Sequence, residues 1–137
     1  MAWVVDTCIL IDVLEGDPDW GALSARLLDR LAPQGLVVCP VTYVELSPAF
    51  GGDAARQDFF LRQINVRTDS DWTYADTLAA HSAWHRHTTA RRQAKAAKRP
   101  VADIQIGAFA ERFAGLVTRN RDDYRGVFPH LEIACPA

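Results

Sequence analysis

The sequence predicts an α/β fold in which helices cover both faces of a central, mostly parallel sheet of four to five strands. Short apolar runs alternate with longer segments in which apolar residues recur at helical spacing. Such alternation favours parallel strands joined by helical crossovers. The 137 residues, of which 49% are hydrophobic, fit one domain with a single core. We therefore predict a single domain over residues 1–137.

The predicted elements are bounded by turn and capping residues. Residues 3–5 form an apolar strand, after which Ile9, Leu10 and Val13 recur at helical spacing. Asp19 is a candidate cap for a second helix. The later elements are predicted as a strand over 36–39, a helix from 42, a helix over 53–63, a strand over 64–66, a helix over 71–97, a helix over 100–115, a strand over 115–118 and an edge strand over 131–133.

The cysteines and the N-terminus bear on the compartment. Cys8, Cys39 and Cys135 are widely spaced and form no C-x-x-C pair, so we expect reduced, buried thiols in a cytoplasmic protein. Asp6 and Asp12 interrupt the apolar N-terminal stretch, which lacks a basic start, and we expect no export signal. No stretch approaches the ~20 apolar residues of a membrane span, so we expect no membrane association.

Acidic side chains stand where predicted strands give way to helices. They are Asp6, Glu45, Asp103 and an acid at Asp122 or Asp123. In a parallel sheet, residues just past the carboxyl ends of the strands line one crevice, so acids distant in sequence can meet there. Crowded carboxylates repel one another unless a cation neutralises them. Oxygen ligands of this kind suit Mg²⁺ or Mn²⁺, and the sequence predicts such a site.

Each acid also has a structural explanation. Asp6 could cap the first helix, and Thr42 with Glu45 matches a capping box. Asp103 lies three residues after Pro100, where the helix dipole favours an acid. Caps can equally be Ser, Thr or Asn, yet each of these turns supplies an ionisable oxygen. The joint occurrence of the acids therefore favours a metal site over separate caps.

Other candidate residues receive weaker functional interpretations. His81 and His85 have the i, i+4 spacing of two zinc ligands, but no acid follows the first histidine and no third ligand is evident. Cys8 stands close to the predicted metal, but it lacks a histidine partner in the sequence and is interpreted as a small buried residue. Asp12 and Asp17 are predicted to be solvated or capping residues.

A basic segment is the second functional signal. No Asp or Glu occurs between residues 77 and 102, and this window contains Arg86, Arg91, Arg92, Lys95, Lys98 and Arg99. One interpretation is a solvated helix end whose cations complement the helix dipole. The other is a surface for the phosphate backbone of a nucleic acid, formed by Arg86, Arg91, Arg92 and Lys95.

Four motifs in a fixed order resemble those of a known family. They are Asp6-Thr7-Cys8-Ile9-Leu10-Ile11-Asp12, Thr42-x-x-Glu45, Val101-Ala102-Asp103-Ile104-Gln105-Ile106-Gly107-Ala108 and Thr118-Arg119-Asn120-x-x-Asp123-Tyr124. Together they resemble the PIN-domain ribonucleases, above all the VapC toxins of bacterial toxin–antitoxin pairs and their FitB-like relatives. The resemblance runs from Val4 to about Phe128, nearly the whole chain.

The resemblance implies a fold, an activity and partners. It implies a PIN-like three-layer fold and an Mg²⁺- or Mn²⁺-dependent endoribonuclease that hydrolyses RNA phosphodiester bonds. The RNA substrate could be tRNA, rRNA or mRNA. The resemblance further implies that the protein acts as a toxin, that a small VapB-type antitoxin inhibits it, and that it forms a homodimer.

The same resemblance assigns roles to individual residues. It places catalytic and metal-binding carboxylates at Asp6, Glu45, Asp103 and Asp123, and cleft-lining residues at Thr7, Thr118 and Asn120. Two positions depart from the family pattern. Asn120 stands where relatives often have Asp, and Cys8 stands where they usually have Asn or Ser.

Other classes of α/β protein are weighed against this hypothesis. A receiver domain usually carries adjacent acids after its first strand and a late lysine, and a haloacid-dehalogenase-type phosphatase carries Asp-x-Asp there. This chain instead has Asp6-Thr7-Cys8 at that point. A non-catalytic PIN-like module that binds nucleic acid or regulates another protein would keep the fold without the chemistry, and it remains the alternative.

Overall fold

Five parallel strands form the central sheet of the computed structural model, which describes residues 1–94 and 100–137. The strands are β1 (Trp3–Val5), β2 (Leu36–Val37), β3 (Val66–Arg67), β4 (Gly115–Val117) and β5 (Ile133–Ala134). Their order across the sheet is β3-β2-β1-β4-β5, and every neighbouring pair is parallel. The predicted parallel sheet is confirmed, and β1 lies at its centre.

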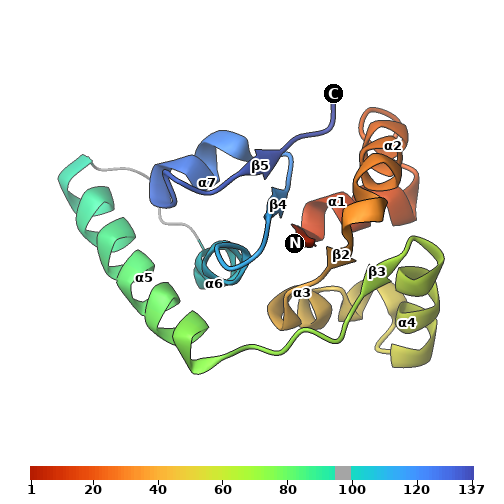
Figure 1. Cartoon of the computed structure of the whole chain (residues 1–137), viewed down its shortest axis with the longest axis horizontal. Helices are drawn as coiled ribbons and strands as arrows, with labels where there is room; N and C mark the ends of the chain where they lie inside the picture. Colours follow the sequence, from red (N-terminus) through yellow and green to blue (C-terminus); the bar gives the residue numbers. More distant parts are fainter. Residues whose placement is uncertain (95–99) are drawn as a thin grey trace.

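Helices cover both faces of this sheet (Figure 1). The α-helices are α1 (Thr7–Glu15), α2 (Gly21–Leu31), α3 (Pro40–Glu45), α4 (Ala54–Gln63), α5 (Tyr74–Ala94), α6 (Val101–Ala110) and α7 (Arg121–Val127). Short 3-10 turns, η1 (Ala32–Gln34) and η2 (Ser47–Phe50), follow α2 and α3. In the part of the chain that the structure describes, no helix combines the length and apolar character needed to cross a membrane.

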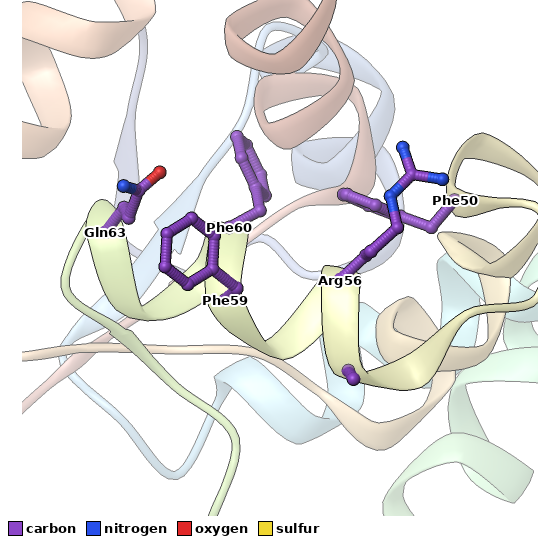
Figure 2. A pocket seen from close by; sticks show the side chains of 6 residues that line it. Phe50, Arg56, Phe59, Phe60 and Gln63 are labelled. Carbon is purple, nitrogen blue, oxygen red and sulfur yellow. The ribbon is translucent and has the colours of Figure 1, made fainter.

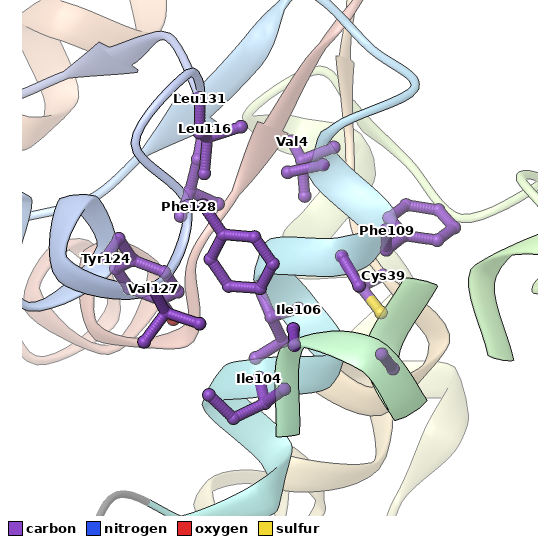
Figure 3. Close-up of a cluster of buried hydrophobic side chains, with 14 of the residues drawn as sticks. Val4, Cys39, Ile104, Ile106, Phe109, Leu116, Tyr124, Val127, Phe128 and Leu131 are labelled. Atoms are coloured by element: carbon purple, nitrogen blue, oxygen red, sulfur yellow. The ribbon is translucent and has the colours of Figure 1, made fainter. Parts of the chain in front are cut away.

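The alternation of side chains along each strand divides the core between the two faces of the sheet. Val4 and Val37 point into a cluster with α5, α6 and α7 (Figure 3), whereas the neighbouring Val5 and Leu36 point into a second cluster with α1, α2 and α4. Successive strand residues face opposite sides of a sheet. Short, wholly apolar strands are therefore what a sheet buried on both faces requires.

The start of α2 differs from the prediction for a local reason. The carboxylate of Asp17, rather than that of Asp19, organises the turn, since its Oδ1 accepts the backbone N–H groups of Asp19 (2.9 Å) and Trp20 (2.8 Å). Pro18 has no N–H to donate, so the turn closes on the second and third residues after Asp17. Asp17 thus closes the turn before α2, whose N-cap residue is Trp20, and the predicted cap at Asp19 is wrong.

An ion pair anchors α5 to the end of α6. Thr73 and Asp76 form a capping box, in which the Thr73 N–H donates to Asp76 Oδ2 (2.9 Å) and the Asp76 N–H donates to Thr73 Oγ1 (3.2 Å). Arg112 donates to both carboxylate oxygens of Asp76 (2.8 and 2.9 Å). Burial raises the pKa of Asp76, but the bonds from Arg112 and Thr73 outweigh it and lower the pKa overall. The carboxylate is thus held ionised.

Close packing between α6 and the end of α7 depends on one glycine. The ring of Phe128, which directly follows α7, points at α6 (Figure 3), and a Cβ atom at Gly107 would overlap this ring. Gly107 is buried in the interior of α6. The absence of a side chain at this position is therefore what lets the two elements approach.

We predict that Gly107→Ala lowers the free energy of unfolding by about 1–3 kcal/mol, as overpacking of a core does. Alanine in a helix interior is otherwise favoured over glycine by roughly 0.5–1 kcal/mol, so the expected sign is the reverse of the usual one. Urea denaturation followed by circular dichroism measures the change.

The matched control is Gly126→Ala in α7, where an added Cβ meets nothing within 4 Å. This variant should be as stable as the parent or slightly more stable. Equal stability of both variants would contradict the proposed packing of Phe128 on Gly107.

Candidate active site

Asp6 lies at the carboxyl end of the central strand and is held by its neighbours on two sides. Its Oδ1 accepts the backbone N–H of Thr7 (2.8 Å), and its Oδ2 accepts the hydroxyl of Thr118 (2.7 Å), which follows β4. Only 5% of Asp6 is exposed. Asp6 does cap α1, as the structural explanation held, but its second oxygen is engaged by a different part of the chain.

The charge of Asp6 is costly in this position. Burial raises the pKa of its carboxyl, and the negative charge of Asp103 raises it further, while the bonds from Thr118 and Thr7 lower it without reversing the shift. Asp103 lies in the first turn of α6 and is partly buried. Two carboxylates from separate elements therefore lie within reach of each other's field, where a cation would be favourable.

Thr7 connects this pair to a third acid. Its Oγ1 lies 2.8 Å from Glu45 Oε1 and 3.2 Å from Thr42 Oγ1. The capping box between Thr42 and Glu45, the structural alternative for this acid, does not form, because α3 already begins at Pro40, a favoured first helical residue. Thr42 is instead buried within α3, and Glu45 is its exposed last residue.

The position of α3 is fixed from the side of α4. The buried Gln57 donates from Nε2 to the backbone carbonyl of Tyr43 (2.8 Å), and the Tyr43 hydroxyl donates to Asp58 Oδ1 (2.7 Å). Because Glu45 follows Tyr43 by two residues on a helix of six residues, these bonds hold the helix that carries it. The sequence analysis did not identify this role of Gln57 and Asp58.

The fourth acid belongs to α7, the helix that follows β4 as the sequence analysis expected. Asp122 and Asp123 both lie in its first turn and both are exposed. Asn120 is the N-cap residue, but its side chain makes no capping bond to α7. Its backbone N–H donates to Thr118 Oγ1 (3.1 Å). Asn120 therefore acts on the site through its main chain, by its bond to Thr118.

Apart from the thiol of Cys8, the side-chain groups found together around Asp6 are oxygen donors. Within residues 1–94 and 100–137, no three His, Cys, Asp or Glu side chains form a group that could hold a metal ion. Mg²⁺ commonly binds through one or two carboxylates and keeps several waters. The buried carboxylate of Asp6 beside the charge of Asp103 fits an ion bound in that way. His81 and His85, the pair weighed for zinc, lie on α5.

Cys8 lies beside Asp6 without the properties of a nucleophile. Its Sγ is 3.6 Å from Asp6 Oδ2 and 3.8 Å from Thr118 Oγ1. Burial, and then the charge of Asp6, raises the pKa of the thiol to about 11. The thiol is thus protonated at neutral pH, and the thiolate is the form that attacks or binds metal.

Asp12 was expected to be solvated or capping, and this prediction is wrong. Only 4% of Asp12 is exposed, and Arg119 Nε lies 2.8 Å from its Oδ2 while Arg119 Nη2 donates to its Oδ1 (3.2 Å). The guanidinium also stacks on Trp20, at 5.3 Å from the ring centroid. An acid between Ile11 and Val13 in an apolar helix was the available signal.

The basic surface lies on α5, which packs along α6. Arg86 and Arg92 are exposed and Arg91 is partly buried. The Arg86 Nη2 donates to the backbone carbonyl of Val127 (3.5 Å). Lys95, the fourth predicted RNA-binding residue, lies outside the described residues. The described arginines therefore stand on the helix next to the one that carries Asp103.

An apolar hollow of about 400 Å³ lies on α4, away from these acids. Phe50, Phe59 and Phe60 line it together with Arg56 and Gln63 (Figure 2). Its lining contains no carboxylate, so the hollow is separate from the group formed by Asp6, Asp103 and Glu45.

Comparison with known proteins gives a likeness in structure alone. No family model matches the sequence, and no curated protein matches it significantly. Among solved structures, a chain of the crystal structure of VapBC2 from Rickettsia felis, bound to a DNA fragment from their promoter, matches with a TM-score of 0.70 at 19% identity. The match covers 98% of this chain and 98% of that chain. The PIN-like α/β fold is thus confirmed over the whole chain.

We predict that the Thr7 hydroxyl couples α1 to Glu45. In a double-mutant cycle of Thr7→Val and Glu45→Met, each of which removes one partner of the bond, the coupling energy should be about 1 kcal/mol, the net value of one such hydrogen bond. Thermal denaturation of the four proteins measures it. Thr7→Ser keeps the hydroxyl and should retain the coupling. Strictly additive effects of Thr7→Val and Glu45→Met would show that the bond does not form in solution.

Proposed function

We propose that this chain is a VapC-like toxin, a Mg²⁺- or Mn²⁺-dependent endoribonuclease whose activity a small antitoxin blocks. The observation that carries the proposal is the buried Asp6 carboxylate, held by Thr118 and Thr7 beside the charge of Asp103. It lies where ligands bind in open parallel sheets, past the carboxyl ends of the strands. The fold shared with VapBC2 supports the same proposal.

The residues of the cluster would divide the work of hydrolysis. Asp6 and Asp103 would hold the ion, directly or through waters, and Glu45 and Asp123 would orient the attacking water or a second ion. When bound, the metal supplies a water of lowered pKa and stabilises the charge that builds on the phosphate. Thr118 keeps Asp6 in one orientation by its bond to Oδ2. Thr7 does the same for Glu45.

The products distinguish this chemistry from metal-free RNA cleavage. If water attacks the phosphate, the fragments carry a 5′-phosphate and a 3′-hydroxyl. Attack by the ribose 2′-hydroxyl would instead leave a 2′,3′-cyclic phosphate. End-group analysis of the fragments therefore tests the assignment.

We predict that Asp103→Asn abolishes RNA cleavage and leaves the fold intact. Loss of an outer-shell partner of a metal ligand typically reduces activity by roughly 10- to 100-fold. Loss of Asp103, which would hold the ion itself, should reduce turnover by more than that. Cleavage of structured RNA by purified protein with Mg²⁺, and again with EDTA, measures the effect. Turnover by Asp103→Asn at the parent rate, or cleavage that persists in EDTA, would overturn the proposal.

Two neighbouring variants serve as controls in the same assay. Asp122→Asn and Asp123→Asn remove one charge each from the first turn of α7, at positions that are both exposed. The resemblance places the catalytic acid at Asp123, so Asp123→Asn should lose activity and Asp122→Asn should retain it.

A non-catalytic module that binds nucleic acid is the second candidate. It is favoured by the lack of a three-ligand group among the described residues. Both candidates use the basic surface of α5, but only the nuclease cuts the RNA that it binds. Stable RNA binding in Mg²⁺ with no cleavage would select this alternative.

We predict that Arg91 and Arg92 contact RNA phosphates. Binding should weaken steeply with salt, and replacing both residues with Gln should make the slope of log K against log salt shallower by roughly 0.7 per lost contact. Fluorescence anisotropy with labelled single-stranded RNA measures the slope. The control replaces Arg26 and Arg30, both exposed on α2, and should leave the slope unchanged. Equal slopes for both double variants would exclude the α5 surface.

The partner follows from the same proposal. A small VapB-type antitoxin encoded by an adjacent reading frame should co-purify with the chain and silence its cleavage of RNA. The toxin itself would act as a homodimer. Full cleavage activity in the presence of the purified neighbouring product would argue against the toxin–antitoxin assignment while leaving the nuclease intact.

A further inference from the structure

The Asp12–Arg119 pair ties α1 to the turn that carries Thr118. The two residues are 107 positions apart in the sequence. Arg119 directly follows Thr118, whose hydroxyl donates to Asp6 Oδ2 (2.7 Å). Asp12 lies on the same helix that Asp6 caps. The ion pair therefore joins both ends of the Thr118–Asp6 hydrogen bond through a second connection.

The Thr118 hydroxyl accepts one hydrogen bond and donates another. Thr118 Oγ1 accepts the backbone N–H of Asn120 (3.1 Å) and donates its own proton to Asp6 Oδ2. The Asn120 N–H thereby leaves the hydroxyl proton free to point at the carboxylate. Arg119 lies between these two residues, so anchoring its side chain holds the backbone that sets both bonds.

The pair is built in a way that favours orientation over stability. A buried carboxylate loses its hydration, and a single ion pair recovers that cost only with excellent geometry and further hydrogen bonds. The guanidinium of Arg119 also lies over the ring of Trp20. Trp20 is held in turn by its backbone N–H, which donates to Asp17 Oδ1. The side chain of Arg119 is thus confined from two directions.

We propose that Asp12 and Arg119 are positioning residues that hold the Thr118 hydroxyl against Asp6 and so set the affinity of the site for a divalent cation. The part concerning cation affinity rests on the proposed function. Neither residue contacts the reacting atoms, and their effect passes through Thr118. Outer-shell partners of metal ligands commonly act in this way.

The experiment compares two arginine–aspartate pairs in the full-length protein. Arg119→Met, Asp12→Asn and the double variant break the pair beside the site. Arg112→Met breaks the Asp76 pair, in which the guanidinium donates to both carboxylate oxygens and which joins the start of α5 to the residues after α6. Mn²⁺ affinity is measured by electron paramagnetic resonance, and Tm by calorimetry in EDTA.

The expected result separates positioning from stability. Arg119→Met and Asp12→Asn should each weaken Mn²⁺ binding by roughly tenfold or more, and the double variant should be no weaker than the worse single one. Arg112→Met should lower Tm while its Mn²⁺ affinity stays at the parent value. Parent affinity in Arg119→Met, or an equal loss in Arg112→Met, would overturn the inference.

Hydrogen exchange of the Asn120 amide makes the test independent of metal. In metal-free protein, Arg119→Met should expose this amide, which donates to Thr118 Oγ1, and Arg112→Met should not. Unchanged protection in Arg119→Met would overturn the inference. A parent protein that binds no Mn²⁺ would instead defeat the proposed function, and the amide would still decide whether Arg119 holds Thr118.

Discussion

The burial of one carboxylate at the end of the central strand is the constraint on which the site depends. Asp6 has neighbouring strands on both sides because β1 is the middle strand of the sheet, and only 5% of it is exposed. A buried charge is costly unless it is paired or hydrogen-bonded. The turn after β4 supplies the hydroxyl of Thr118, and the start of α1 supplies the N–H of Thr7. These bonds decide how both segments leave the sheet.

The two buried arginine–aspartate pairs show that the same chemistry has different consequences in different surroundings. The pKa of Asp76 is lowered, because Thr73 adds a backbone hydrogen bond to the two from Arg112. The pKa of Asp12 is raised, because burial outweighs the charge of Arg119. Although Asp12 Oδ2 lies 2.8 Å from Arg119 Nε, it makes no hydrogen bond within the described residues. The folded protein thus favours the ionised form of the Asp76 carboxylate. For Asp12, the loss of hydration on burial outweighs the attraction of Arg119.

Sequence analysis succeeded where local signals determine the structure and failed where distant partners do. The strand before Asp6 and the helix capped by Asp53 were predicted because apolar runs and caps are local. The helix predicted from residue 42 starts earlier, at Pro40, so the capping box considered at Thr42 does not form. The burial of Asp12 had a local signal in its apolar helix, but its partner could not be predicted, since Arg119 comes from the far end of the chain. Local patterns locate the elements, but only the assembled sheet brings the polar groups together.

The fold alone does not decide whether the chain is an enzyme. A likeness at 19% identity over 98% of both chains shows a shared fold and does not reach the chemistry of the site. The polar residues at the strand ends are a stronger argument. If Asp6 served only as a cap, Ser, Thr or Asn could take its place without bringing a buried charge close to Asp103. Burial and the charge of Asp103 both destabilise the Asp6 carboxylate, and a bound cation would relieve both effects. This supports the nuclease proposal over a purely structural role.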